Sequence, residues 1–161
     1  MPQKLPTLPW KGGCQCGRVR YTLNDYPKTF YCCHCIECQK QSSSMHGESV
    51  LVEASSLKLE GETKIWSRKT DSGNTTNCHF CPDCGNRIFH ASTHRDNDND
   101  GDIISLKGGL LEEIKDMEPV GHIWLKSAQA GFRADPEAMR YDAQPKSYKQ
   151  LIEKFAKRYN S

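Results

Sequence analysis

The chain has no long hydrophobic run and no large excess of charge of either sign. No stretch approaches the roughly 20 apolar residues that a membrane-spanning helix requires, and residues 1–6 contain no apolar run of signal-peptide length. The 161 residues include 22 Lys and Arg against 20 Asp and Glu, which leaves a formal net charge of +2. Such a balance argues against binding of nucleic acid by phosphate neutralisation. We therefore expect a cytoplasmic protein without a membrane or nucleic-acid partner.

Internal repeats, low-complexity tracts and a glycine- or proline-rich linker are also absent from the sequence. Compact domains most often contain roughly 100–150 residues, and a chain of this length buries enough surface to fold without cross-links. We therefore predict a single domain over residues 1–161.

Helical patterns are scarce before the C-terminus, and short segments rich in β-branched and aromatic residues recur instead. Turn residues separate them about every ten positions, which is typical of an antiparallel β fold. The segments cover residues 14–21, 29–33, 49–52, 57–59, 64–66, 75–80, 87–90 and 102–106. The Asn- and Asp-rich segment 96–102 is expected to be a loop between the last two of these strands.

One helix is expected at the C-terminal end, over residues 147–159. Tyr148, Leu151, Ile152, Phe155 and Tyr159 recur there at steps of three and four, which places them on one face of an amphipathic helix. Ser147 and Gln150 have the spacing of a capping box at its start. The sequence therefore predicts a mainly β fold with a C-terminal amphipathic helix.

Cysteine is abundant, with nine residues. In a reducing compartment such a chain more often binds metal than forms disulfides. Cys14 and Cys16 lie in a segment of strand character, where alternation points both sulfurs to one side. Cys81-Pro-Asp-Cys84-Gly85 reads as a knuckle, in which Gly85 takes a positive φ and turns backbone amides toward the sulfurs. Together the four thiolates would complete the tetrahedral shell of a structural zinc ion.

A second group lies between residues 32 and 38. Cys33 and Cys35 share one face of an extended segment, Cys38 returns after a turn, and Cys32 and His34 fall on the other face. Three ligands leave a fourth position for water or substrate, which is typical of a catalytic zinc ion. The alternative is that a distant His or Cys78 closes the shell and makes the site structural. We interpret Cys32 and Cys78 as ordinary buried residues.

Other polar residues near the second group are candidates for substrate chemistry. His46 follows the third cysteine and is the candidate acid–base group. Four cations close to the cysteines in sequence could bind substrate carboxylates, or could be ordinary surface charges: Arg18, Arg20, Lys40 and Arg87.

Five motifs occur together in this chain: Cys14-Gln-Cys16-Gly17, Cys33-His34-Cys35-x-x-Cys38-Gln39, Cys81-Pro-Asp-Cys84-Gly85, Lys107-Gly108-Gly109-Leu110 and Pro119-x-x-His122-Ile123. In this combination the sequence resembles the GFA family over roughly residues 10–134. The family is named for glutathione-dependent formaldehyde-activating enzyme, or S-(hydroxymethyl)glutathione synthase, and its relatives include centromere protein V. The remaining residues would form a C-terminal extension that carries the helix over about 147–159.

The resemblance implies an Mss4-like, mainly antiparallel β fold with two zinc ions per chain. It assigns Cys14, Cys16, Cys81 and Cys84 to a structural ion, and Cys33, Cys35 and Cys38 to a catalytic one. The implied activity is that of a carbon–sulfur lyase that acts on an aldehyde adduct of glutathione or a similar small thiol. A non-catalytic, zinc-stapled binding module is the alternative. The chain departs from the common pattern at Phe132, Met45–His46 and Asn86–Arg87, which leaves the substrate open.

Overall fold

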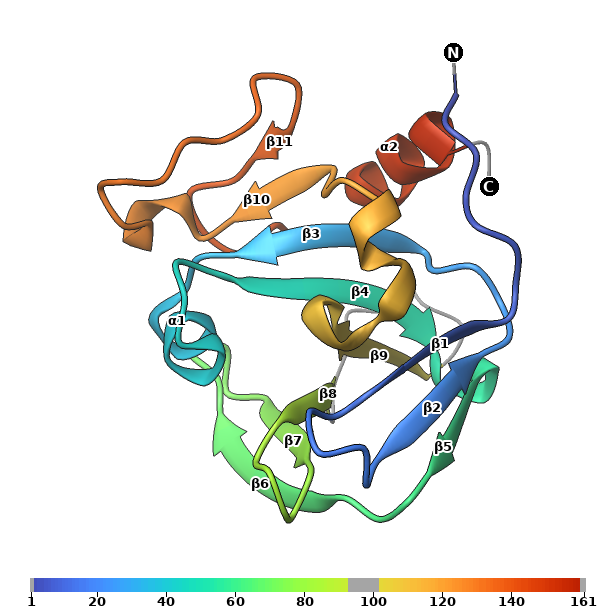
Figure 1. The fold of residues 1–161 in the computed structure, drawn as a ribbon. Coiled ribbons are helices and arrows are strands. Elements are labelled where there is room, and N and C mark those ends of the chain that lie inside the picture. Colours follow the sequence, from blue (N-terminus) through green and yellow to red (C-terminus); the bar gives the residue numbers. More distant parts are fainter. Residues whose placement is uncertain (1, 93–101, 160–161) are drawn as a thin grey trace.

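The computed structural model describes residues 2–92 and 102–159. Within these residues, strands dominate and helices are short (Figure 1). The strands are β1 (Trp10–Gly13), β2 (Arg20–Leu23), β3 (Thr29–Cys33), β4 (Gly47–Glu53), β5 (Leu57–Glu60), β6 (Lys64–Lys69), β7 (Thr75–Phe80), β8 (Arg87–Ser92), β9 (Ile103–Lys107), β10 (Gly121–Ile123) and β11 (Met139–Arg140). The α-helices are α1 (Ile36–Ser42) and α2 (Lys149–Tyr159), and 3-10 turns occupy Ala54–Ser56, Gly108–Leu110, Glu112–Asp116 and Leu125–Ser127.

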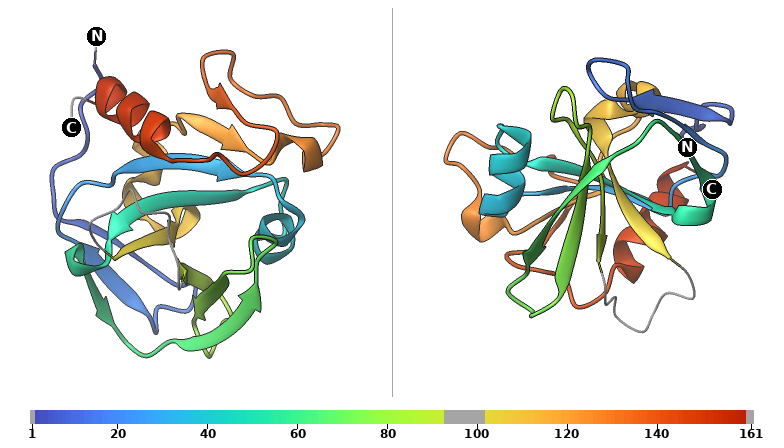
Figure 2. Two further views of the ribbon diagram at one scale, coloured as in Figure 1. Left: turned by 180° about the vertical axis from the view of Figure 1, so that it is seen from behind. Right: turned by 90° about the horizontal axis from the view of Figure 1, so that it is seen from below.

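The strands form two sheets. The smaller has the order β1-β2-β5, and the larger has the order β11-β10-β3-β4-β9-β8-β7-β6. The larger sheet bends strongly, so that β6, β7 and β8 run across the direction of β3 and β4 (Figure 2). The bend brings β6 and β8 close to α1, the helix that follows β3 (Figure 1).

The predicted fold class is confirmed: the chain is mainly β, with a C-terminal helix and two cysteine clusters, as expected of an Mss4-like protein. Several details of the prediction are wrong. Most of the expected strand over 14–21 does not form, because β1 ends at Gly13 and β2 begins only at Arg20. Cys14 and Cys16 therefore lie in the connecting turn. Helix α1 was not expected, and β10 pairs in parallel with both β3 and β11 in an otherwise antiparallel sheet.

Helix α2 packs against β3 on the outer side of the larger sheet (Figure 1). Leu151 and Phe155 are fully buried, and the Thr29 hydroxyl donates a hydrogen bond to the carbonyl of Leu151 at 3.1 Å. Only half of the expected capping box forms. The Ser147 hydroxyl accepts from the amide of Lys149 at 3.1 Å, whereas the side chain of Gln150 accepts from the Tyr141 hydroxyl at 3.0 Å. The helix thus supports the strand that ends at Cys33.

The structure describes only part of the chain, and this bears on the expected loop and on membrane spans. The Asn- and Asp-rich loop expected over 96–102 falls almost wholly outside the described residues. In the part that is described, no helix is long and apolar enough to cross a membrane. The single domain over residues 1–161 stays a prediction.

The packing of α2 leads to a stability prediction. Phe155→Ala should lower the free energy of unfolding by roughly 3–5 kcal/mol, because it removes a fully buried ring between α2 and the sheet. Glu153→Ala, at an exposed position of the same helix, should change it by no more than about 0.5 kcal/mol. Urea unfolding followed by circular dichroism measures both. Equal stability of the two variants would mean that α2 does not belong to the cooperative core.

Candidate metal centres

The first cluster joins the β1–β2 turn to the β7–β8 turn. The sulfurs of Cys14, Cys16, Cys81 and Cys84 all lie within 4.8 Å of one another. Cys14 and Cys16 Sγ are 3.5 Å apart, and Cys16 and Cys81 Sγ are 3.7 Å apart. A tetrahedral ion with zinc–sulfur bonds of about 2.3 Å would hold its sulfurs about 3.8 Å apart. The spacing of the sulfurs therefore fits a closed four-thiolate site. Cys14 and Cys16 reach it from a turn, and not through the strand alternation predicted from the sequence.

Local backbone turns orient the sulfurs of the first cluster. The amide of Val19 donates to Cys14 Sγ at 3.2 Å. Gly85 has a φ of 77°, as the knuckle requires, and its amide donates to the carbonyl of Cys81 at 3.0 Å. The amides of Asn86 and then Cys16 lower the pKa of the Cys84 thiol to about 6. Hydrogen bonds from the backbone thus favour the thiolate form that binds a metal ion.

The second cluster forms where β3 passes into α1. The sulfurs of Cys33, Cys35 and Cys38 lie within 4.8 Å of one another. Cys33 ends the strand, and Cys35 has an extended backbone (φ −64°, ψ 154°) and caps the helix. The Cys35 sulfur accepts from the amide of Cys38 at 3.4 Å. The predicted grouping of these three is observed, but Cys38 returns to the cluster on the first turn of a helix.

The three thiols of the second cluster affect one another's pKa. Hydrogen bonds with the thiols of Cys33 and Cys38 hold the pKa of Cys35 well below its usual range. Hydrogen bonds with Cys35 and Cys38, followed by burial, raise the pKa of Cys33 well above it. Thiolates this close together repel one another, so a bound cation would favour the ionisation of all three. Three clustered sulfurs fit a soft divalent ion such as zinc.

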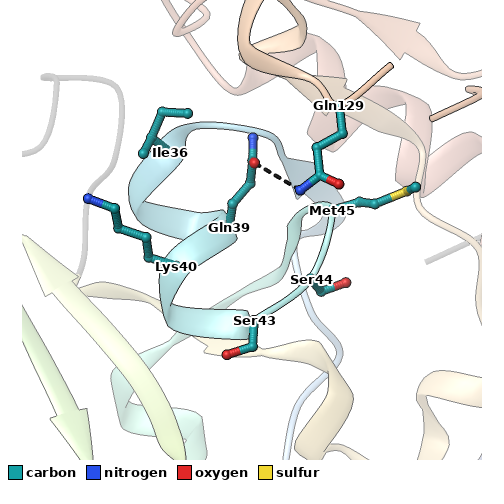
Figure 3. Close-up of a pocket in the computed structure, with 7 residues that line it drawn as sticks. All are labelled: Ile36, Gln39, Lys40, Ser43, Ser44, Met45 and Gln129. Atoms are coloured by element: carbon teal, nitrogen blue, oxygen red, sulfur yellow. Dashed lines mark hydrogen bonds between the residues drawn. The ribbon is translucent and has the colours of Figure 1, made fainter. Parts of the chain in front are cut away.

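Gln39 fixes the loop that carries the second cluster. Its amide nitrogen donates to the carbonyls of His34 at 2.7 Å and Ser127 at 2.8 Å. Its oxygen accepts from Gln129 at 3.1 Å, as Figure 3 shows. Sequence reasoning quoted Gln39 only as part of a motif. Its role depends on contacts with a segment almost 90 residues away, which no local pattern reveals.

Three histidines lie close together at the end of β3, whereas the sequence predicted only the face of His34. His34 Nε2 lies 3.1 Å from His122 Nδ1, and the ring centroids of His34 and His46 are 5.0 Å apart. Phe132 packs on all three rings. Burial is the main cause that lowers the pKa of His34 and of His122 to about 4, so both are neutral at pH 7. His46 joins this cluster and does not line the cavity beside Cys38.

Cys32 and Cys78 are both buried and belong to neither cluster, and all nine cysteines are free thiols. Among the described residues no histidine or further cysteine joins the second group. The alternative in which a distant His or Cys78 closes its shell therefore finds no support in the geometry.

Two cavities flank α1. The larger, about 520 Å³, is walled by Ile36, Gln39, Lys40, Ser43, Ser44, Met45 and Gln129, and none of the clustered cysteines is part of that wall (Figure 3). The smaller, about 230 Å³, is lined by Glu37, Cys38, Lys40, Gln41, Trp66, Arg68, Arg87 and His90. A small molecule that reaches the second cluster would therefore occupy the smaller cavity.

The four cations singled out from the sequence have different surroundings. Arg18 pairs with Asp83 at 3.0 Å and Arg20 with Glu112 at 2.8 Å, both as half-exposed ion pairs. Lys40 and Arg87 line the cavity beside Cys38. Arg68, which sequence reasoning missed, lines it as well, because strand pairing brings β6 close to the cysteines.

The two clusters predict the metal content and its dependence on single cysteines. The purified chain should contain two zinc ions. The Cys84→Ser variant should lose one ion and most of its free energy of unfolding, because structural zinc contributes roughly 10–16 kcal/mol to folding in small zinc peptides. Cys78→Ala, at a buried cysteine outside both clusters, should keep two ions. Elemental analysis and thiol titration measure the outcome. Less than one ion per wild-type chain, with all thiols titratable, would contradict the prediction.

Known proteins that are similar to this chain were found as one family and as solved structures. Residues 9–127 match the model of a family described as glutathione-dependent formaldehyde-activating enzyme, GFA. No curated protein matches the chain. The solved structures include a similar Rhodobacter sphaeroides protein, with 17% identity, a TM-score of 0.47, and coverage of 81% of this chain and 98% of that chain. The family match spans most of the chain and both cysteine clusters, and the chain therefore belongs to the GFA family.

Proposed function

We propose that the chain is a zinc-dependent enzyme that makes or breaks the carbon–sulfur bond of a thiol adduct of an aldehyde. The thiol would be glutathione or a similar small molecule, and the second cysteine cluster would be the reaction site. The observation that carries this proposal is the contrast between the clusters: four sulfurs close the first, whereas three sulfurs and an adjoining cavity form the second. Membership of a family that includes glutathione-dependent formaldehyde-activating enzymes supports it.

Cys33, Cys35 and Cys38 would hold the ion. When bound, zinc supplies an open position at which a substrate thiol loses its proton near neutral pH. Three thiolate ligands make a soft site, which suits sulfur better than a hard oxygen. The chain therefore favours positioning of the thiol over polarisation of the carbonyl.

The bonds and protons balance without any further reagent. The sulfur of the thiolate forms a bond to the carbonyl carbon, and the carbon–oxygen π bond breaks. The proton that the thiol released ends on the former carbonyl oxygen, which gives a hemithioacetal. In the reverse direction the hydroxyl loses that proton and the thiolate leaves carbon. His46, the candidate for proton transfer from the sequence, lies with His34 and His122 and does not line this cavity, so no residue is assigned to this proton transfer.

The cavity supplies the setting for this reaction. Trp66 and Gln41 form part of its wall beside Cys38. Gly47 packs directly against Cys38, since a Cβ added there would lie 3.2 Å from Cys38 Cβ and 3.6 Å from its sulfur. The second cluster thus has close protein contact on one side and a small cavity on the other.

The reaction predicts how single substitutions act. Cys35→Ser should lower the rate of hemithioacetal formation at least about 100-fold, because it removes a proposed ligand of the reacting centre. The fold should persist, since the first cluster is intact. Cys78→Ala should retain the wild-type rate. The assay mixes glutathione with a panel of aldehydes and subtracts the spontaneous reaction, which is itself fast.

The same assay separates the enzyme from a binding module. Equal rates with wild-type protein, with Cys35→Ser and without protein, for several thiols as well as glutathione, would contradict catalysis and leave a zinc-stapled binding module.

A mild chelator tests whether the second centre is open. We expect it to remove one ion first and leave the far-ultraviolet circular dichroism unchanged, because the second cluster has one protein ligand fewer and adjoins a cavity. Loss of both ions in one step, together with the fold, would indicate a closed, structural second site.

A further inference from the structure

The smaller cavity is bounded by one face of the β6–β8 end of the larger sheet. In β7, Thr76 and Cys78 are two residues apart and pair with Arg68 and Trp66 of β6. Cross-strand partners share a face, and so do residues two apart in a strand. Trp66 and Arg68 therefore project from the same face of the sheet, toward Cys38.

A β-bulge brings Arg87 to this same face. Cys78 pairs with His90 and Phe80 pairs with Arg87, so Ile88 has no partner at the register shift between His79 and Phe80. Without the bulge, Arg87 and His90 would lie on opposite faces because they are three positions apart in the strand. With it, Arg87 Nη1 lies 3.0 Å from His90 Nε2. Two arginines from different strands thus converge on one cavity.

The positive charge at this cavity exceeds its negative charge. Lys40, Arg68 and Arg87 line it, and Glu37 is the one carboxylate among its lining residues. Glu37 already pairs with Lys40, at 3.9 Å. Within residues 2–92 and 102–159, neither arginine forms an ion pair with a carboxylate. Partly buried cations without a counter-charge leave strong hydrogen-bond donors available to an anion.

Two neighbours hold the Arg87 guanidinium in place. A guanidinium only donates, so His90 Nε2 must be the acceptor of the 3.0 Å contact. Burial first, and then the charges of Lys107, Arg87 and Arg68, hold the pKa of His90 far below its usual range, which keeps the imidazole neutral. On another side, Arg87 Cζ lies 5.6 Å from the centroid of the Trp66 ring. The remaining N–H groups are thereby preorganised.

We propose that this cavity, the basic pocket lined by Trp66, Arg68 and Arg87, binds a carboxylate of the thiol substrate while the thiol reaches the cluster at Cys38. A planar guanidinium matches a carboxylate with two parallel hydrogen bonds. A cavity of about 230 Å³ accommodates one end of a small peptide-like thiol. The proposal rests on the proposed function for the identity of the ligand, and it assigns Arg87 and Arg68 as residues that set substrate specificity.

The test compares two thiols that differ only in their carboxylates. The zinc-loaded full chain is titrated with glutathione and with its dimethyl ester, and binding is followed by calorimetry and by tryptophan fluorescence. The wild-type protein should bind the ester about 10- to 100-fold more weakly than glutathione, because the ester carries no negative charge and cannot form an ion pair with a guanidinium.

Variants of Arg87 locate the contact. Arg87→Ala should weaken binding of glutathione about 10- to 100-fold and leave binding of the ester unchanged, so that discrimination disappears. Arg87→Lys should restore only part of it, because an ammonium lacks the planar fork. Arg20→Ala removes an exposed arginine that pairs with Glu112, and it should bind both ligands as the wild type does. If Arg87→Ala does not fold or loses metal, Arg68→Ala takes its place and should also reduce the discrimination.

The outcomes separate the pocket from the reaction. Equal binding of glutathione and ester by the wild type, or equal behaviour of the folded Arg variant and Arg20→Ala, would overturn the pocket even if turnover is present. Arginine-dependent discrimination in binding without turnover of any aldehyde would support the pocket and contradict the proposed reaction.

Discussion

The first cysteine cluster is the constraint on which the rest of the site depends. It fastens the turn between β1 and β2, in the smaller sheet, to the turn between β7 and β8 in the larger one. Cys84 is separated from Arg87 by only Gly85 and Asn86. The cluster therefore fixes the point at which β8 begins, and with it the position of the guanidinium beside Cys38. A structural metal centre would in this way determine the geometry of a substrate pocket without touching the substrate.

The second cluster uses a different device, the junction of a strand and a helix. Strand β3 is buried along its whole length and is supported by β4, β10 and α2, which would make Cys33 a rigidly held metal ligand. Helix α1 is only seven residues long, and its N-terminal amide at Cys38 points at the sulfur of Cys35. Gln39 then fastens this turn to the carbonyls of His34 and Ser127. Three sulfurs are thereby held from one side while the other side faces a cavity.

Sequence spacing predicted which cysteines group together, because motifs such as Cys81-Pro-Asp-Cys84 impose their own local geometry. It predicted the face of Cys33 and Cys35 for the right reason, since the backbone at Cys35 is extended. The same argument was wrong for Cys14 and Cys16, because Gly17 has a φ of 81° and the segment turns. Helix α1 was missed because its capping residue is a cysteine, whereas the usual capping signals are Ser, Thr, Asp and Asn.

The basic pocket could be predicted only in part: the sequence named Lys40 and Arg87 as candidate cations but could not place them together with Arg68 in one cavity, for two physical reasons. Alternation along β8 places Arg87 and His90 on opposite faces, and only the bulge at Ile88 reverses this. Arg68 reaches the cysteines through the pairing of β6 with β7 and of β7 with β8, which are contacts between strands and leave no local pattern. Long-range pairing and an irregular register thus decide the half of the site that would recognise substrate, whereas local motifs decide the half that would bind metal.

The charges of the site form a consistent arrangement. Three thiolates around one divalent ion would leave a net negative charge next to Lys107, which is buried, and the charges of Cys38 and Cys33 oppose the lowering of the Lys107 pKa by burial. The negative charge of the metal-bound cluster would then balance the positive charge of Lys107. Arg68 and Arg87 lie farther out, at the cavity, and no described carboxylate balances them. A thiol that carries a carboxylate would bind with its sulfur toward the metal centre and its carboxylate toward the arginines. The proposed carbon–sulfur chemistry at the second cluster requires this orientation.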